Sequence, residues 1–357
     1  MANTATLPPA PAPSSAPGQR GDERIGQRSP FQKLLGRPEV GALVGAVVLF
    51  IFFAFVSSTF TQPNALATVL YGSSTIGIMA VGVSLLMIGG EFDLSTGVAV
   101  ISSALTASLF SWNFSLNAWV GVVLALVVSL GIGFINGWIL VKTKLPSFIV
   151  TLATFLMLTG LNLALTRAIG GSVSSPSISK LDGFDSAHAV FASSISIGGV
   201  EVKITVFFWI ILVAIASWIL LRTKVGNWIF AVGGDANAAR AVGVPVTKTK
   251  IGLFMAVGFC GWILGMHNLF AFDAVQSGEG VGNEFLYIIA AVIGGCLLTG
   301  GYGSAVGGAI GAFIFGMANK GIVYAQWNPD WFKFFLGLML LLATIVNLIV
   351  KRRAELK

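Results

Sequence analysis

The stretch ALATVLYGSSTIGIMAVGVSLLMIGGEFDLSTG, residues 65–97, joins a long apolar run to two carboxylates. Its first 24 residues contain no Asp, Glu, Lys or Arg, and another uncharged run of 17 residues begins at Leu94. A helix needs about 20 apolar residues to cross the hydrocarbon core of a bilayer. Residues 65–88 are therefore predicted to span a membrane, and Glu91 and Asp93 fall at a break before the next span.

The composition extends this prediction to the whole chain. Of the 357 residues, 55% are hydrophobic and only 10% are charged, whereas a soluble domain has about 25% charged residues. The mean hydropathy is +0.89. We therefore predict an all-α polytopic membrane protein without a separate soluble domain.

Ten apolar segments are candidate membrane spans. They are residues 40–59, 65–88, 94–110, 118–141, 146–166, 204–221, 251–272, 285–298, 305–323 and 331–350. An even number of spans places both ends of the chain on the same side of the membrane. Short or glycine-interrupted spans indicate discontinuous helices in transporters, so discontinuous elements are expected near residues 89–97 and 272–304.

The basic residues predict which side this is. Sixteen of the 21 Lys and Arg residues fall in the two ends of the chain and in the loops after residues 118–141 and 204–221. Cytoplasmic loops are enriched in Lys and Arg, so both termini are predicted to be cytoplasmic. The net charge of +7 is then explained by basic residues on the cytoplasmic side of the membrane, next to lipid. We therefore expect membrane lipid, and no nucleic acid, as a partner.

The two ends of the chain differ from the apolar middle. Residues 1–37 are rich in Pro, Ala and Ser, which cannot bury a core, and they predict a disordered cytoplasmic tail. Residues 38–350 form the expected transmembrane domain, and residues 351–357 form a basic cytoplasmic C-terminus. The apolar run from Val40 is expected to act as a signal anchor.

The sequence shows no pattern of catalytic or metal-binding residues. His188 and His267 are far apart, and neither forms a metal-ligand spacing with Cys260 or Cys296. The chain has no GxxxxGK[ST] loop to hold nucleotide phosphates. We expect no enzymatic activity and no metal or cofactor on this chain.

The largest loop on the basic side, residues 222–251, predicts a short capped helix. Asp235 can accept hydrogen bonds from the first-turn amides of the following ANAARAV. Gly243 can supply a left-handed residue at the C-terminus, and Pro245 prevents the helix from continuing. The segment is either an ordinary connector or a compact handle for a cytoplasmic motor.

Four blocks occur in the order and at about the spacing found in the permease subunits of ribose-type ATP-binding cassette (ABC) importers, which this chain resembles over residues 40–350. The blocks are GGEFDLSTG, LPSFIVTLATFLMLTG, VGNWIFAVGGDANAARAVGVPVTKTKI and NEFLYIIAAVIGGCLLTGGYGSAVGG. The resemblance implies import of a monosaccharide or small polyol across the bacterial inner membrane. It also implies three partners: an ATPase subunit that holds ATP and Mg, an extracytoplasmic sugar-binding protein, and a second permease subunit.

The resemblance further implies roles for individual residues. The segment near 235–245 would be the coupling helix that docks into the ATPase. Its implied coupling residues are Asp235, Ala238, Ala239, Arg240, Gly243 and Pro245. The second permease subunit would be another copy of this chain or a related chain, because one chain lines half a pore.

The substrate path is predicted from polar groups within spans and from the motifs above. The predicted path residues are Glu91, Asp93, Ser95, Thr96, Phe148, Thr151, Asn162, Asp273 and Glu284. Other polar residues in spans could instead hydrogen-bond between helices; they are Asn136, Thr154, His267, Asn268 and Asn319. For GGEFDLSTG two interpretations remain open: a cytoplasmic turn in which Asp93 or Ser95 caps the next span, or a segment that re-enters the membrane and faces the path.

An internal similarity and two departures from the family pattern remain. AFDAVQSGEG, after span 251–272, resembles EFDLSTG, and the offset of five spans predicts inverted repeats. However, IGGCLLTGGYGS resembles IGGEFDLSTG almost as well, in a parallel arrangement. Leu286 and Thr159 stand where family members often have an acidic residue and an arginine, so the sugar itself is not predicted.

Two alternative functions stay open. A related permease with the same architecture could import branched-chain amino acids. A secondary sugar transporter could couple to protons through Glu91, Asp93 or Asp273, because carboxylates within spans are candidates for proton transfer. Such a carrier would have no need of the capped helix near residues 235–245.

Overall fold

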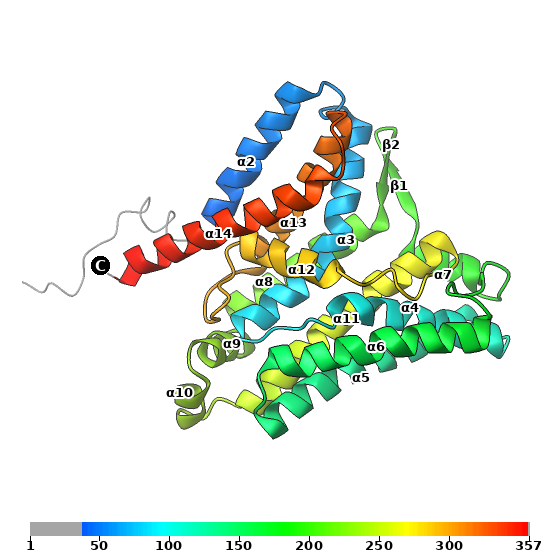
Figure 1. Cartoon of the computed structure of the whole chain (residues 1–357), viewed down its shortest axis with the longest axis horizontal. Helices are drawn as coiled ribbons and strands as arrows, with labels where there is room; N and C mark the ends of the chain where they lie inside the picture. Colours follow the sequence, from blue (N-terminus) through cyan, green and yellow to red (C-terminus); the bar gives the residue numbers. More distant parts are fainter. Residues whose placement is uncertain (1–37, 356–357) are drawn as a thin grey trace, which may run out of the picture.

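The computed structural model describes residues 38–355, with side chains described for residues 39–345. The predicted N-terminal tail, residues 1–37, and the last two residues of the predicted basic C-terminus lie outside the described residues. The described chain is mostly helical (Figure 1). A small antiparallel hairpin of β1 (Ser194–Ile197) and β2 (Val200–Lys203) interrupts the helices.

Ten of the described helices coincide closely with the predicted spans, and three further short helices lie between spans. They are α2 (Pro38–Val56), α3 (Pro63–Ile88), α4 (Thr96–Asn113), α5 (Ala118–Thr143), α6 (Ser147–Gly170), α7 (Phe184–Phe191), α8 (Ile204–Arg222), α9 (Lys224–Gly234), α10 (Ala236–Ala241), α11 (Val246–Phe272), α12 (Asn283–Ile293), α13 (Ala305–Tyr324) and α14 (Trp331–Glu355).

Seven of the helices in residues 38–355 are long and apolar enough to cross a membrane: α2, α3, α5, α6, α8, α11 and α13. The apolar segments of α12 and α14, residues 283–293 and 331–345, are shorter. The apolar sequence of α4 is interrupted by Ser and Thr residues, and most of their side chains are buried. The prediction of an all-α polytopic membrane protein is confirmed at this level.

The two central helices are α3 and α11, which are more buried than α2 or α6. Helix α3 packs most extensively against α13, and α11 packs most extensively against α5. The packing of α4 on α5 likewise matches that of α12 on α13. Exchanging α3 with α11 and α5 with α13 therefore reproduces the pattern of neighbours, as the repeat with an offset of five spans predicts.

The predicted breaks are present at both glycine pairs. Helix α3 ends at Ile88 and α12 ends at Ile293, and in each case the second glycine of the pair has a positive φ, +82° at Gly90 and +95° at Gly295. Such a left-handed residue is the usual way to end a helix. Helix α12 is shorter than the predicted span 285–298 because Gly294 and Gly295 end it early. The sequence similarity of IGGEFDLSTG and IGGCLLTGGYGS therefore reflects the same kind of helix end at both places.

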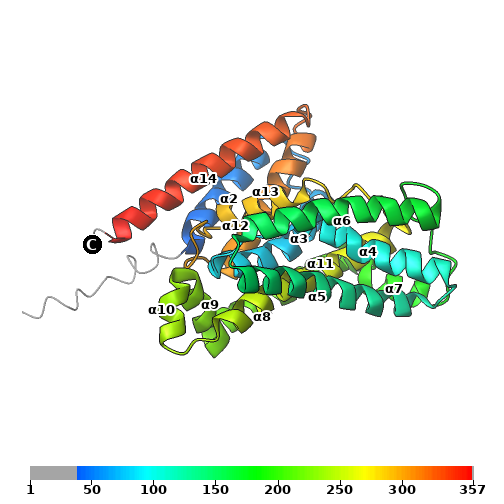
Figure 2. The ribbon, with the colours of Figure 1, turned by 60° about the horizontal axis from the view of Figure 1, so that its bottom comes forward.

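Two surface elements of the bundle were not predicted. Figure 2 places α9, α10 and the C-terminus at one end of the molecule and α7 at the other. Helix α7 and the β1–β2 hairpin lie in residues 167–203, between the predicted spans 146–166 and 204–221, where no helix or strand was predicted. Gly198 and Gly199 connect the strands with φ of +60° and +83°, as a two-residue hairpin turn requires.

Candidate functional site: a polar cavity and a cytoplasmic-type capped helix

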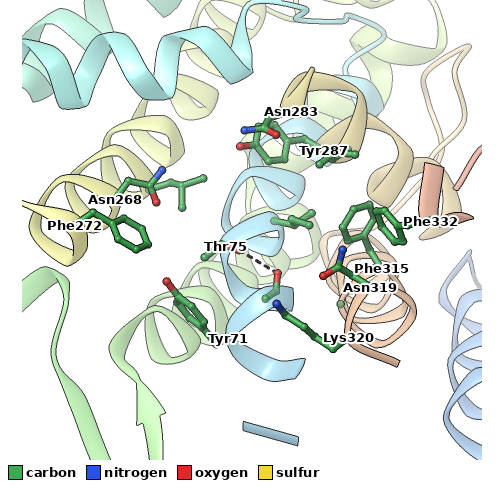
Figure 3. A pocket seen from close by; sticks show the side chains of 15 residues that line it. Tyr71, Thr75, Asn268, Phe272, Asn283, Tyr287, Phe315, Asn319, Lys320 and Phe332 are labelled. Carbon is green, nitrogen blue, oxygen red and sulfur yellow. Dashed lines mark hydrogen bonds between the residues drawn. The ribbon is translucent and has the colours of Figure 1, made fainter. Parts of the chain in front are cut away.

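A polar cavity of about 380 Å³ lies among α3, α11, α12, α13 and α14 (Figure 3). Helices α3, α11, α12 and α13 each contribute residues three or four positions apart, which share one helix face, and α14 contributes Phe332. Examples are Tyr71 and Thr75 on α3, and Asn268 and Phe272 on α11. The cavity therefore exists only because five helix faces converge. A second groove of about 450 Å³, between α2, α3, α8 and α13, is almost wholly apolar.

The polar lining of the cavity suits a ligand with hydroxyl groups. Asn268, Asn283 and Asn319 come from three different helices and point toward the same space (Figure 3). A carboxamide carries both a donor and an acceptor, so it can bind a hydroxyl group in either role. Together they can satisfy several hydroxyl groups of one small molecule.

Aromatic side chains supply the apolar part of the lining. Phe272, Phe315 and Phe332 border the cavity, and the rings of Phe315 and Phe332 meet edge to face with centroids 4.9 Å apart. The C–H face of a sugar ring can stack on such surfaces while its hydroxyl groups reach the carboxamides. This division of labour is typical of small-molecule sites, which combine apolar walls with a few placed polar groups.

A hydrogen-bond chain fixes the hydroxyl group of Tyr71 at the cavity. The Tyr71 hydroxyl lies 3.0 Å from Nε2 of His267, whose Nδ1 lies 2.8 Å from the carbonyl oxygen of Phe191. Because that carbonyl can only accept, Nδ1 of a neutral His267 carries the proton and Nε2 accepts from Tyr71. The Tyr71 oxygen is then left to accept a hydrogen bond from a ligand.

The nine predicted path residues lie outside this cavity. Glu91, Asp93 and Ser95 belong to the connection between α3 and α4, and Thr96 is the first residue of α4; all four are buried. The Lys250 ammonium forms an ion pair with the Glu91 carboxylate. The Asp93 carboxylate accepts from the backbone amide of Ser95 at 2.8 Å and from its hydroxyl group.

Neighbouring helices hold the same connection in place. The backbone amide of Leu94 donates to the Thr151 hydroxyl at 3.1 Å. Asn136 donates to the Ser95 hydroxyl oxygen at 3.1 Å and accepts from Thr154 at 2.6 Å. Ser95 occupies the cap position of α4, but its side chain does not cap the helix, because its hydroxyl group is used by Asp93 and Asn136.

The connection runs into the bundle rather than over its surface. Gly97, in the first turn of α4, lies directly against Gly280 in the connection between α11 and α12, so neither position has room for a side chain. These connections leave α3 and α11 at opposite ends of the molecule (Figure 2). They therefore meet inside it, with the N-terminal ends of α4 and α12 in contact.

The other predicted path residues occupy separate places. Asn162 links α6 to α4 by accepting from Ser102 at 2.9 Å and donating to the carbonyl oxygen of Val98 at 3.2 Å. Phe148, on α6, is 52% exposed. Asp273 ends α11 with a φ of +61°. The buried Glu284 accepts from the backbone amide of Gly282 at 3.0 Å.

The capped helix predicted near residues 235–245 is α10, and its predicted ends are confirmed. Oδ1 of Asp235 accepts from the backbone amides of Asn237 and Ala238, at 2.8 and 3.0 Å. The hydrogen bonds from Ala238 and Asn237 hold the pKa of the exposed Asp235 carboxyl below its ordinary value. Gly243 follows with a φ of +86°, and Pro245 precedes α11.

Helix α10 is attached to the bundle through α9, which was not predicted. Ala239 is buried between α10 and its neighbours, while Ala238 and Arg240 are exposed. Gly233 of α9 packs directly against the carbonyl oxygen of Ile88 and against Gly301. Helix α9 thus rests on the end of α3 and on the connection between α12 and α13.

Sequence reasoning missed most of the cavity. Asn268 and Asn319 were considered mainly as groups that could hydrogen-bond between helices, and Lys320 was not among the predicted path residues. The adjacent polar pair Asn319 and Lys320 within an otherwise apolar span was the available signal. Tyr71 and Thr75 gave no signal, because such residues are common in spans.

The chain matches a protein family over most of its length. The family is described as the permease component of the branched-chain amino acid transport system, and its model matches residues 65–344. The ribose import permease protein RbsC of Escherichia coli (strain K12) is 31% identical over 315 residues, which are 87% of this chain and 93% of the relative. No solved structure matches the chain.

Two further relatives are also import permeases. The galactose/methyl galactoside import permease protein MglC of Escherichia coli (strain K12) is 30% identical over 322 residues, 87% of this chain and 94% of the relative. The fructose import permease protein FrcC of Rhizobium meliloti is 26% identical over 317 residues, 88% of this chain and 86% of the relative. These relatives are transport permeases rather than enzymes. The chain belongs to this family of ABC-type permease components, multi-pass proteins of the bacterial inner membrane.

Proposed function

We propose that this chain is the membrane subunit of an ABC importer that carries a monosaccharide or a small polyol into the bacterial cell. The observation that carries the proposal is the cavity in which Asn268, Asn283 and Asn319 face aromatic side chains. Hydroxyl-binding carboxamides beside apolar rings fit a sugar. Relatives that import ribose, galactose and fructose support the same substrate class.

The topology proposed for this function has ten spans and cytoplasmic termini. It divides the chain into a tail of residues 1–37, a transmembrane domain of residues 38–350 with the coupling helix, and a basic end of residues 351–357. Helices α4, α12 and α14 would complete the seven long spans. The position of α9, α10 and the C-terminus at one end of the molecule supports this arrangement (Figure 2).

The partners follow from the same arrangement. A separate ATPase subunit would hold ATP and Mg and would bind the exposed face of α10, through Ala238 and Arg240. An extracytoplasmic sugar-binding protein would dock at the opposite end, near α7 and the β1–β2 hairpin. A second permease subunit, most simply another copy of this chain, would complete the pathway.

The predicted path residues take a different role in this proposal. The buried connection that contains Glu91, Asp93, Ser95 and Thr96 would act as part of an inner gate, because it lies between the cavity helices and α9. Its meeting with the α11–α12 connection at Gly97 and Gly280 supports the re-entrant interpretation. Phe148, Thr151, Asn162, Asp273 and Glu284 would support this gate rather than bind sugar.

Uptake by the reconstituted importer tests the proposal. The chain would be placed in proteoliposomes with its ATPase and binding protein, and ATP-dependent uptake of labelled monosaccharides and polyols, both neutral and anionic, and of leucine would be measured. The leucine arm is included because the family description names branched-chain amino acids. We expect one sugar or polyol to accumulate and Asn268→Ala or Asn319→Ala to lower its uptake about tenfold or more.

The matched control is Asn64→Ala, because Asn64 is exposed at the start of α3 and does not line the cavity. Accumulation of leucine alone would contradict sugar import and would assign a branched-chain amino acid as the substrate. Sugar uptake that needs no ATP and stops with a protonophore would instead establish a proton-coupled carrier.

A further inference from the structure

The sugar cavity contains an unbalanced positive charge. Among the described residues that line it, Lys320 on α13 is the one charged side chain, and no Asp or Glu is present. Figure 3 shows its side chain reaching from α13 toward Thr75. A neutral sugar needs no such charge, since carboxamides and hydroxyl groups already offer donors and acceptors.

Lys320 has no ionic partner within the described part of the chain. The ion pair formed there joins Lys250 to Glu91, and no carboxylate lies within 4 Å of the Lys320 ammonium. The side chain is only partly exposed. A partly exposed ammonium group with no carboxylate beside it can pair with an anionic group of a ligand that enters the cavity.

Two simpler explanations account poorly for this position. Cations near a helix C-terminus are stabilised by the helix dipole within the last turn, but the last turn of α13 has no basic residue and Lys320 precedes it. Lysines near a membrane surface often extend into water. Lys333 on α14 does so, since it is exposed, whereas the Lys320 stem lies against α3 at Gly72, where an added Cβ would be 3.4 Å from its Cε.

The remaining lining indicates the rest of the ligand. The Tyr71 oxygen is an acceptor because its proton is directed to His267. A ligand must therefore bring a hydroxyl donor to Tyr71 and an acceptor or negative charge to Lys320. The volume of about 380 Å³ is near the lower end of small-molecule sites, which run from roughly 300 to 1,000 Å³, and admits one sugar unit.

We infer that the preferred substrate is an anionic monosaccharide or polyol, with one carboxylate or phosphate group bound by Lys320 and its hydroxyl groups bound by the carboxamides. This inference rests on the proposed sugar-import function and narrows its substrate class. The carboxylate and phosphate forms share the chemistry that Lys320 recognises. Lysine binds either as a compact point charge.

Matched neutral and anionic sugars test the inference. ATP-driven uptake would be compared for galactose against galacturonate, and for ribose against ribose 5-phosphate, in proteoliposomes of the complete complex. The same ligands would be added to the detergent-purified full chain in a thermal-shift assay, which does not depend on selection by the binding protein. We expect galacturonate or ribose 5-phosphate, but neither neutral sugar, to raise the melting temperature and to be taken up.

Variants of Lys320 test whether this side chain binds the anionic group of the substrate. Lys320→Gln should lower uptake of the anionic sugar about tenfold or more, as expected for the loss of a charged hydrogen bond, and Lys320→Arg should restore most of it. The control Lys333→Gln should leave uptake of both the anionic and the neutral sugar unchanged. Co-purification of the ATPase subunit with Lys320→Gln would show that the complex still assembles.

The outcomes separate this inference from the proposed function. Uptake of a neutral sugar that Lys320→Gln leaves unchanged would overturn the inference and leave sugar import intact. Uptake of an anionic sugar that is equally insensitive would overturn the role of Lys320. If no sugar of either kind is bound or taken up, the proposed function fails together with the inference.

Discussion

The Lys250 ammonium forms an ion pair with the carboxylate of Glu91, which lies 159 positions earlier in the chain. Lys250 is in the first turns of α11, a few residues after α10, and Glu91 is in the buried connection between α3 and α4. The pair therefore joins the proposed ATPase handle to the proposed inner gate. In the proposed mechanism, a movement of α10 would reach both central helices, α3 and α11, at this ion pair.

Breaking this pair should destabilise the protein and uncouple it. The two side chains are only 17% and 10% exposed, and removing one partner of a buried ion pair costs about 3–5 kcal/mol. Glu91→Gln and Lys250→Gln should each lower the melting temperature of the detergent-purified chain and reduce sugar-stimulated ATPase activity. The exchange Glu91→Lys with Lys250→Glu should recover part of the loss.

The matched control for the pair is Lys248→Gln, because Lys248 is exposed on the same turn. Equal effects of Lys248→Gln and Lys250→Gln would mean that total charge near α11, not the pair with Glu91, matters. Proton-driven uptake that is lost in Glu91→Gln would indicate a carrier instead.

Alanine substitution at two adjacent glycines of α9, Gly233 and Gly234, should affect stability very differently. An alanine at Gly233 would collide with the carbonyl oxygen of Ile88, whereas a Cβ at Gly234 meets nothing within 4 Å. Gly233→Ala should cost about 1–3 kcal/mol, as overpacking does, and should weaken the attachment of α10. Gly234→Ala should be tolerated. Melting temperatures and ATPase coupling would be measured for both, and equal behaviour would refute the tight contact between α9 and α3.

The cap of α10 should be insensitive to pH in the physiological range. Since the folded state lowers the pKa of Asp235, its stabilising contribution is present above the ordinary value of 3.8 and is lost as the pH falls through the lower folded value. Hydrogen exchange of residues 236–241, corrected for intrinsic rates, should stay constant from about pH 5 to about pH 8. Asp235→Ala should speed this exchange, and Asp235→Asn should largely preserve protection because Asn also caps helices.

Tyr71 and His267 should act as one unit in substrate recognition. Either Tyr71→Phe or His267→Phe removes the hydrogen bond that orients the Tyr71 hydroxyl. Each should raise the sugar concentration for half-maximal uptake about five- to tenfold, and the double variant should be no worse than either single variant. His188→Gln, on the outer helix α7, is the control. Additive losses would show that the two side chains bind substrate independently.

The helices were largely predictable because the apolar runs of a membrane protein record them directly. The ends of α10 were also predictable, since Asp235 and Gly243 act locally through a cap and a left-handed residue. Helix α11 begins at Val246, five residues before the predicted span, because hydropathy does not register the polar turn VTKTK. The β1–β2 hairpin had a usable signal, two alternating runs around Gly198 and Gly199, that the loop prediction passed over.

The cavity could not be predicted in the same way. Its residues lie on five helices, and their convergence depends on how those helices pack rather than on any local pattern. The carboxylates Glu91 and Asp93 stood out in the sequence because they are charged, yet the structure uses both in internal pairs with Lys250 and Ser95. Uncharged residues such as Asn283 belong to the cavity only because α12 packs beside α3.

Access to a single cavity position tests the central claim most directly. Asn319→Cys places a thiol at the cavity, and the natural Cys260 and Cys296 are both buried, so a small methanethiosulfonate reagent should modify the new thiol selectively. Lys333→Cys, at the same end but outside the cavity, is the control. We predict that modification of Asn319→Cys blocks ATP-driven sugar uptake and that the transported sugar slows the modification, with neither effect in Lys333→Cys. Full uptake after complete modification of Asn319→Cys would contradict a substrate pathway through this cavity.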